Sequence, residues 1–380
     1  MTETEQTGLA GIIVGDTALS TVGKAGIGLT YRGYDIHELA ASATFEEVAY
    51  LLIYRELPSE SELKTYCSRL VALRAIPNEL KLLLETMPGS AHPMDVLRTG
   101  ISLLGTLEPE STKHSAYQIA DRLIACAPSI LLYWYQFYRN NKRLDITQYA
   151  DKTTADFFLH ALTGKKPEQE QGRALDVALI LYAEHEFNAS TFAARVTIST
   201  GSDFYSAVVS AIGTLRGPLH GGANEEAMRL IASFQMPNLV EATIKSMLVD
   251  KVKIMGFGHR VYKISDPRSD VVKAWVETLS KNSSEAPLFD IAQGIEKVMW
   301  REKKLFPNLD FYSALLFHFC DIPTLLFTPI FVMSRLSGWS AHILEQRAHN
   351  RLIRPEAKYI GMEKRSFKSL KDRTSATSTK

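Results

Sequence analysis

Residues 8–36 read GLAGIIVGDTALSTVGKAGIGLTYRGYDI, and residues 9–35 form the only clearly strand-like region of the 380-residue chain. Short β-branched pieces such as residues 11–14 and 20–22 alternate with glycines, a pattern typical of small hairpins. Beyond them, apolar residues recur at helical spacing, for example over 203–215. Strands do not alternate regularly with helices, so a parallel α/β sheet is not expected. We therefore predict a mainly α protein with a small β element at 9–35.

The overall composition is that of an ordinary globular protein. Lys and Arg total 43 against 42 Asp and Glu, and the net charge of +1 argues against a general nucleic-acid or anionic-membrane surface. Cys67, Cys126 and Cys320 are scattered without CxxC spacing, so neither a disulfide framework nor a thiolate metal site is expected. The start of the chain, MTETEQTG, has no apolar signal segment, and we expect a cytoplasmic protein.

The stretch 314–332 is the most membrane-like part of the sequence. It contains His318, Asp321, Pro323 and Pro329, which would be costly in lipid. We predict two buried helices joined at a proline break, and no membrane partner.

Three segments contain polar residues suited to chemistry. In the first, GPLHGGAN at 217–224, His220 lies on backbone that can bend sharply and come close to a ligand. A helix that starts near Glu225 would favour the neutral imidazole, because a helix N-terminus disfavours added positive charge. The alternative is an incidental histidine in a turn.

In the second segment, GFGHR at 256–260, glycines again bracket a histidine, His259. Asp266 followed by Pro267 predicts a helix N-cap, which would leave Arg268 free to point at a carboxylate. The Gly-x-Gly is not a dinucleotide fingerprint, because the third glycine and a surrounding βαβ unit are missing.

In the third segment, FPNLDFYS at 306–313, Asp310 precedes an apolar run. Asp310 could be the N-cap of the helix that follows. Alternatively, its apolar neighbours would raise the pKa of the carboxyl group and strengthen it as a base. The local sequence leaves both interpretations open.

Single polar residues elsewhere have weaker signals. Arg335 and Arg354 offer side chains suited to holding carboxylates bidentately, with ordinary surface charge as the alternative. His185 has acidic neighbours but no HExxH pattern, so a metal site is not expected there.

Together these segments resemble those of the citrate synthase family, and within it the 2-methylcitrate synthases, from about residue 8 to 361. GPLHGGANE, GFGHRVYK with DPR, FPNLDFYS, and SRLSGW with AHILEQR and RP occur in family order. The run at 8–36, the segment YAEHEFNAS, and Ala314 after DFYS resemble the methylcitrate version.

The resemblance implies a reaction and a role for each motif residue. Asp310 would remove the α-proton of an acyl-CoA, and His220 would hydrogen-bond the thioester oxygen. His259 would donate to the keto oxygen of oxaloacetate, and the adduct would then be hydrolysed. Propionyl-CoA, giving 2-methylcitrate, is the expected donor, with acetyl-CoA also accepted. Acyl-CoA is a substrate, and no metal or other cofactor is expected.

The resemblance also implies the binding residues and the assembly. His185, Arg268, Arg335 and Arg354 would hold oxaloacetate. Arg354 would come from the partner subunit, which implies a homodimer with shared active sites. The segment that would receive CoA comprises Lys253, Ile254, Met255 and Gly256.

The implied architecture is a two-domain helical fold. Residues 1–222 and 316–380 would form a large domain with a flexible C-terminal tail. Residues 223–315 would form a small domain that carries catalytic residues and closes over bound oxaloacetate.

Two other functions remain open. The first is a citrate synthase that uses acetyl-CoA, since one methylene in an apolar pocket is worth only about 0.8 kcal/mol. The second is a non-catalytic sensor of CoA or carboxylates on the same scaffold. The presence of His220, His259 and Asp310 together argues against the sensor.

Overall fold

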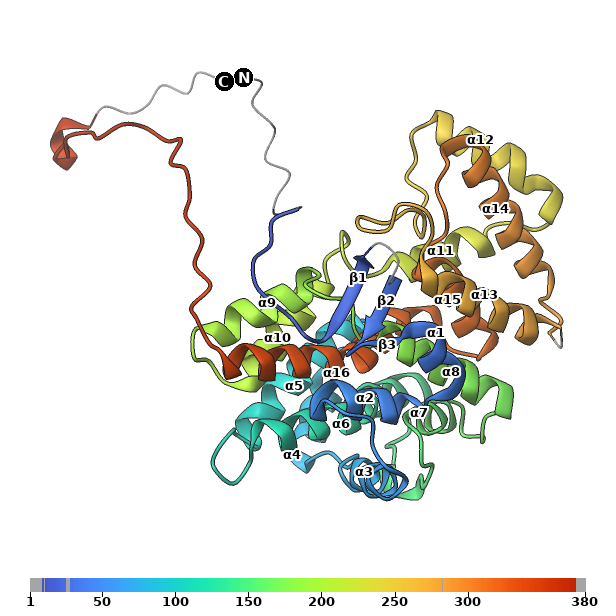
Figure 1. Ribbon diagram of the computed structural model, residues 1–380, viewed down its shortest axis with the longest axis horizontal. Coiled ribbons are helices and arrows are strands. Elements are labelled where there is room, and N and C mark those ends of the chain that lie inside the picture. Colours follow the sequence, from blue (N-terminus) through green and yellow to red (C-terminus); the bar gives the residue numbers. More distant parts are fainter. Residues whose placement is uncertain (1–8, 10, 25–27, 282, 374–380) are drawn as a thin grey trace.

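The computed structural model describes residues 9, 11–24, 28–281 and 283–373. Within these ranges the chain forms sixteen α-helices and one three-stranded antiparallel sheet (Figure 1). The prediction of a mainly α protein with a small β element near its start is confirmed.

The strands are β1 (Ser20–Lys24), β2 (Gly28–Tyr31) and β3 (Tyr34–Asp35), hydrogen-bonded in that order. The helices are α1 (Ile36–Ser42), α2 (Phe45–Tyr54), α3 (Glu60–Ala72), α4 (Asn78–Thr86), α5 (Pro93–Leu107), α6 (Ala116–Asn140), α7 (Thr154–Thr163), α8 (Gln169–Tyr182), α9 (Ala189–Ser199), α10 (Phe204–Leu215), α11 (Ala223–Ala232), α12 (Val240–Val249), α13 (Pro267–Ser280), α14 (Pro287–Lys303), α15 (Leu309–Phe319) and α16 (Phe327–Ala348).

The sheet is shorter than the strand-like sequence suggests. Residues 20–22 lie in β1, as predicted, and Ser20 is opposite Tyr31 of β2. The prediction for residues 11–14 is wrong, because they form no strand, and Ile12 and Ile13 are 61% and 89% exposed. β-branched residues favour a strand only where neighbouring strands and side chains pack against them, and in the described ranges no strand pairs with this segment.

Local capping signals determine where several helices begin. The Thr44 side chain accepts from the Glu47 amide, and the Glu47 carboxylate accepts from the Thr44 amide at 2.8 Å. Ser59 and Glu62 form the same capping box at the start of α3. Each box satisfies two backbone donors that the helix itself leaves unpaired.

Most of the stretch 314–332 is buried in the protein core, although Asp321 is exposed. It spans most of α15, a connection that contains Pro323, and the start of α16, so the predicted break between two buried helices is confirmed. α16 is buried along most of its length and contacts α2, α6, α8 and α9. None of the helices in the described ranges has the length and apolarity needed to cross a bilayer.

Helices α11–α15 gather at one side of the molecule, coloured yellow to orange in Figure 1. α13 and α15 from this group contact α8, which belongs to the rest of the body. The division into a large domain and a small domain at 223–315 remains a prediction.

The chain after α16 leaves the body as an extended segment (Figure 1). Its apolar side chains are solvent-exposed within a single chain, with Tyr359 77% and Phe367 87% exposed.

Candidate functional site

Two loops are joined so that His259 and Asp310 are held on neighbouring segments. The Gly258 amide donates to the Phe306 carbonyl at 2.8 Å, and the Asn308 amide donates to the Gly256 carbonyl at 2.9 Å. Gly256 has a φ of 86°, and a Cβ there would lie 2.9 Å from Cβ of Phe311. Only glycine meets both conditions without strain, so this residue permits the close approach of the loops.

Asp310 lies in the first turn of α15 but does not cap the helix. The Asn308 side chain accepts from the Asp310 amide at 3.1 Å, so Asn308 is the N-cap and the N-cap interpretation of Asp310 is wrong. The Tyr182 hydroxyl donates to Oδ1 of Asp310 at 2.7 Å. Burial raises the pKa of the Asp310 carboxyl, as its apolar neighbours predict.

His220 is held in one tautomer by α9. The Ser190 amide donates to Nε2 of His220 at 3.2 Å, and Oγ of Ser190 lies 2.8 Å from the same nitrogen. A backbone amide can only donate, so Nε2 is unprotonated and the neutral ring carries its proton on Nδ1. Two partly buried hydrogen bonds to a distant helix are not expected of an incidental turn histidine.

The ring of His220 is neutral near pH 7. Burial, followed by the positive charge of Arg335, lowers the pKa of His220 to about 4. α11 does begin close by, at Ala223. Desolvation and the arginine charge are the leading causes of the shift, and the contribution of the helix N-terminus remains a prediction.

His259 is held in the opposite tautomer. The amides of Val261 and Tyr262 both donate to Nδ1 of His259 at 3.1 Å. Nδ1 is therefore the acceptor, and Nε2 carries the proton. Burial, followed by the charge of Arg268, lowers the pKa of His259 to about 4. The ring is neutral near pH 7 and presents an N–H donor.

His185 lies directly beside His259. The two ring centroids are 5.1 Å apart, and Nε2 of His185 lies 3.1 Å from the Tyr262 hydroxyl. Burial lowers the pKa of His185 well below its usual value, with Arg268 and His259 adding to the effect.

Arg268 is not free, contrary to the expectation from its position. Its Nε and Nη2 donate to the two carboxylate oxygens of Asp266 at 2.9 and 2.8 Å. Asp266 also caps α13, as predicted, since it accepts from the Arg268 amide. The Asp266 carboxylate serves both as the N-cap and as the ion-pair partner, because the backbone amide and the guanidinium of Arg268 both lie within its reach.

Arg335 is buried and has no direct ionic partner. It is 2% exposed, which excludes the surface-charge interpretation. Its Nε donates to the Tyr182 carbonyl at 2.6 Å. Within the described part of the chain, no carboxylate lies within 4.0 Å of its nitrogens. A buried cation without a contacting anion favours binding of an anionic ligand.

The remaining predicted residues differ in exposure within a single chain. Arg354 is exposed on the extended segment after α16. Lys253 is exposed, Met255 is half-buried, and Ile254 and Gly256 are buried.

The structure adds Tyr182, Tyr262 and Phe331 to the candidate site. The Phe331 ring centroid lies 4.7 Å from that of Tyr182 and 6.3 Å from that of His220. The guanidinium carbon of Arg335 lies 4.6 Å from the Phe331 ring centroid. Phe331 therefore connects the His220 side of the site to Tyr182 and Asp310. An aromatic residue in an apolar run has no sequence signal that separates such a role from core packing.

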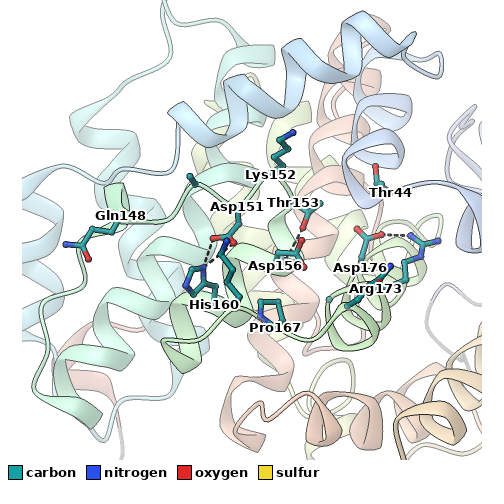
Figure 2. A pocket seen from close by; sticks show the side chains of 14 residues that line it. Thr44, Gln148, Asp151, Lys152, Thr153, Asp156, His160, Pro167, Arg173 and Asp176 are labelled. Atoms are coloured by element: carbon teal, nitrogen blue, oxygen red, sulfur yellow. Dashed lines mark hydrogen bonds and ion pairs between the residues drawn. The ribbon is translucent and has the colours of Figure 1, made fainter.

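A separate groove of about 760 Å³ lies among α7, α8 and the loop before α2 (Figure 2). His160 pairs with Asp151 at 2.9 Å, and Arg173 pairs with Asp176 at 2.6 Å. The lining of this groove contains none of the predicted site residues, and the four charged or titratable side chains named above pair with one another.

The fold and the sequence together define the class of protein. Residues 8–356 match the family model described as citrate synthase, C-terminal domain. The chain belongs to the citrate synthase family, and it is an enzyme of that family.

Individual relatives match over nearly their whole length. The 2-methylcitrate synthase of Shewanella oneidensis is 52% identical over 358 residues, which cover 94% of this chain and 95% of that protein. Citrate synthase 2 of Bacillus subtilis is 42% identical over 371 residues, covering 96% and 98%. The solved ternary complex of citrate synthase from Thermoplasma acidophilum with carboxymethyl coenzyme A and oxaloacetate superposes with a TM-score of 0.90, at 32% identity, covering 98% and 100%. These relatives support a citrate or 2-methylcitrate synthase activity.

Proposed function

We propose that this enzyme condenses propionyl-CoA with oxaloacetate and water to give 2-methylcitrate and CoA. The identity of 52% to a 2-methylcitrate synthase, against 42% to the citrate synthase from Bacillus subtilis, favours propionyl-CoA as the donor. The observation that carries the mechanism is the pair of neutral histidines with opposite, backbone-fixed tautomers.

The first step is removal of a proton from the α-carbon of the acyl-CoA. Asp310 is the base, and its raised pKa strengthens it. A thioester α-proton is weakly acidic, so a base needs help from a donor placed where negative charge develops. Nδ1–H of His220 is that donor, because Ser190 occupies Nε2.

The second step is attack of the resulting carbon nucleophile on the keto carbon of oxaloacetate. Nε2–H of His259 donates to the keto oxygen as it becomes negative. His185, Arg268 and Arg335 hold the two carboxylates. Hydrolysis of the thioester then releases 2-methylcitrate and CoA. A charged imidazole is not needed at either position, which agrees with the low pKa values of His220 and His259.

We further propose a homodimer in which Arg354 completes the site of the partner subunit. Arg354 lies on an extended segment whose apolar side chains are exposed in a single chain. Apolar side chains such as Tyr359 and Phe367 gain a buried environment if this segment packs on a second copy.

The proposal is tested by mixing the purified enzyme with oxaloacetate and propionyl-CoA, following release of free CoA thiol, and identifying the product by mass spectrometry. Thiol release with formation of 2-methylcitrate is expected. Absence of thiol release with every short acyl-CoA would support the non-catalytic sensor instead. Citrate synthesis from acetyl-CoA is the second candidate, because relatives named citrate synthase are 42% identical.

A further inference from the structure

A fully buried carboxylate lies directly behind the proposed oxaloacetate site. Glu184 follows the end of α8, and its Oε1 accepts from Nε2 of His342 at 2.9 Å, from the Glu186 amide at 2.6 Å and from Oγ of Ser20 at 3.0 Å. Its Oε2 is buried and has no hydrogen-bond partner among the residues that the structure describes. The proposed reaction gives this carboxylate no role.

His342 connects Glu184 to Arg195. Nη1 of Arg195 lies 3.0 Å from Nδ1 of His342, and an arginine can only donate. Nδ1 of His342 is therefore the acceptor, and its Nε2–H donates to Glu184. Burial alone would raise the pKa of Glu184, but His342 and the Arg335 guanidinium lower it overall.

Glu184 packs against the face of α16 that carries Arg335. Arg335, Gly338 and His342 are spaced three and four residues apart, so they lie on one helix face. Arg335 donates to the Tyr182 carbonyl, a Cβ on Gly338 would lie 2.5 Å from Oε2 of Glu184, and His342 bonds Oε1. Gly338, against which Oε2 packs, thus lies three residues, about one helical turn, from Arg335.

The positive charges of Arg268 and Arg335 are compensated in different ways. Arg268 is paired directly with Asp266. Arg335 has no contacting carboxylate in the described ranges, and Glu184 is the carboxylate whose charge stabilises its protonated form most strongly. A charge at this separation compensates the buried cation yet leaves the guanidinium nitrogens available to a ligand.

We propose that Glu184 is a resident counter-ion that balances Arg335 in the empty site and thereby limits the affinity for oxaloacetate. The incoming carboxylate and Glu184 act on the same guanidinium and repel each other. Glu184 acts on the substrate through Arg335, so it is a positioning residue. Weaker binding of anions assists release of the tricarboxylate product. The inference rests on the proposed function.

Glu184→Gln tests the inference, because it removes the charge and keeps the shape and one acceptor oxygen. The dissociation constant of oxaloacetate, measured by calorimetry, should fall on the order of tenfold. The KM for oxaloacetate should fall with it, and kcat should fall because the product leaves more slowly. A merely structural defect would raise the dissociation constant. Unchanged or weaker binding in Glu184→Gln would overturn the inference.

Glu345→Gln is the matched control. Glu345 belongs to the same network and pairs with Arg195 at 2.7 Å, but it is not among the leading charges that act on Arg335. Its loss should leave oxaloacetate binding unchanged, and equal tightening in this control would also overturn the inference.

A stability measurement keeps the inference testable if Glu184→Gln folds poorly. The buried charge of Arg335, no longer compensated, should then be the cause of the poor folding. The double variant Glu184→Gln/Arg335→Met should therefore melt at a higher temperature than Glu184→Gln alone. A double variant no more stable than the single one contradicts the inference. Oxaloacetate binding by the unchanged enzyme distinguishes failure of the proposed function from failure of the counter-ion inference. If the unchanged enzyme does not bind oxaloacetate, the proposed function is refuted. If it binds oxaloacetate and Glu184→Gln does not bind it more tightly, only the counter-ion inference is refuted.

Discussion

The Tyr182 hydroxyl donates a 2.7 Å hydrogen bond to Oδ1 of Asp310 across 128 positions of sequence. The carbonyl of the same tyrosine accepts from Nε of Arg335 at 2.6 Å. The last turn of α8 therefore aligns the proposed base with a proposed carboxylate-binding arginine.

Tyr182→Phe should shift the pH dependence of the reaction. The Tyr182 hydroxyl stabilises the ionised form of Asp310, so its loss raises the pKa of Asp310 further. Asp310 acts as a base only when deprotonated, and the acidic limb of the kcat profile should therefore move to higher pH. Tyr312→Phe is the control, since Tyr312 donates to Glu296 and not to Asp310. An unchanged profile in Tyr182→Phe would show that this hydrogen bond does not tune the base.

Asp310→Asn should lower kcat by on the order of 10²–10⁴, the usual contribution of a positioned base. The fold should be retained because Asn308, and not Asp310, caps α15. Oxaloacetate binding, measured by calorimetry, should be largely intact. Loss of folding, seen as a lower melting temperature with loss of binding, would favour a structural role for Asp310.

His220→Ala should lower kcat by on the order of 10²–10³, as expected for one donor at a developing oxyanion. His318→Ala is the control, because His318 pairs with Glu285 outside the site, and surface substitutions of this kind change free energies by only about 0.5 kcal/mol. Steady-state rates with saturating substrates make the comparison. A mild effect of His220→Ala would make it a structural turn residue.

Gly338→Ala should destabilise the protein by about 1–3 kcal/mol. A Cβ at this position would lie 2.2 Å from the Ala183 carbonyl oxygen, so α8 and α16 would have to separate. Gly213→Ala in α10 should instead stabilise by roughly 0.5–1 kcal/mol, since a Cβ added there meets no atom within 4 Å among the described residues outside its own helix. Thermal unfolding of both variants gives the comparison, and equal effects would contradict the packing of these helices.

Subunit mixing should reveal shared active sites. Asp310→Asn and Arg354→Ala are each expected to be inactive. Random mixed dimers contain one site with both defects and one with neither, so about a quarter of the parental activity should return. Co-expression of two differently tagged chains provides the mixture. Persistent inactivity of the mixed dimer would mean that Arg354 serves its own chain or none.

The parts of the fold that sequence predicts well depend on residues close together in the chain. The Thr44 and Ser59 capping boxes and the Asp266 N-cap each involve two residues no more than three positions apart. Residues 11–14 were misassigned because a strand requires a partner elsewhere in the chain, and propensity alone does not supply one.

The candidate site also combines features that local sequence predicts with features that depend on distant segments. Motifs identify His220, His259 and Asp310 as candidates, but the groups that set their chemistry come from distant segments. The tautomer of His220 depends on Ser190, and the environment of Asp310 depends on Tyr182. The pairing of Arg268 with Asp266 is local, yet the N-cap signal alone does not reveal that the side chains also pair.

The most direct measurement is kcat/KM for propionyl-CoA and for acetyl-CoA with oxaloacetate held saturating. One methylene in an apolar pocket is worth roughly 1–3 kcal/mol of discrimination, so propionyl-CoA should be preferred while acetyl-CoA remains measurably active. An advantage for acetyl-CoA above about tenfold, equivalent to 1.4 kcal/mol, would contradict the assignment of propionyl-CoA as the donor.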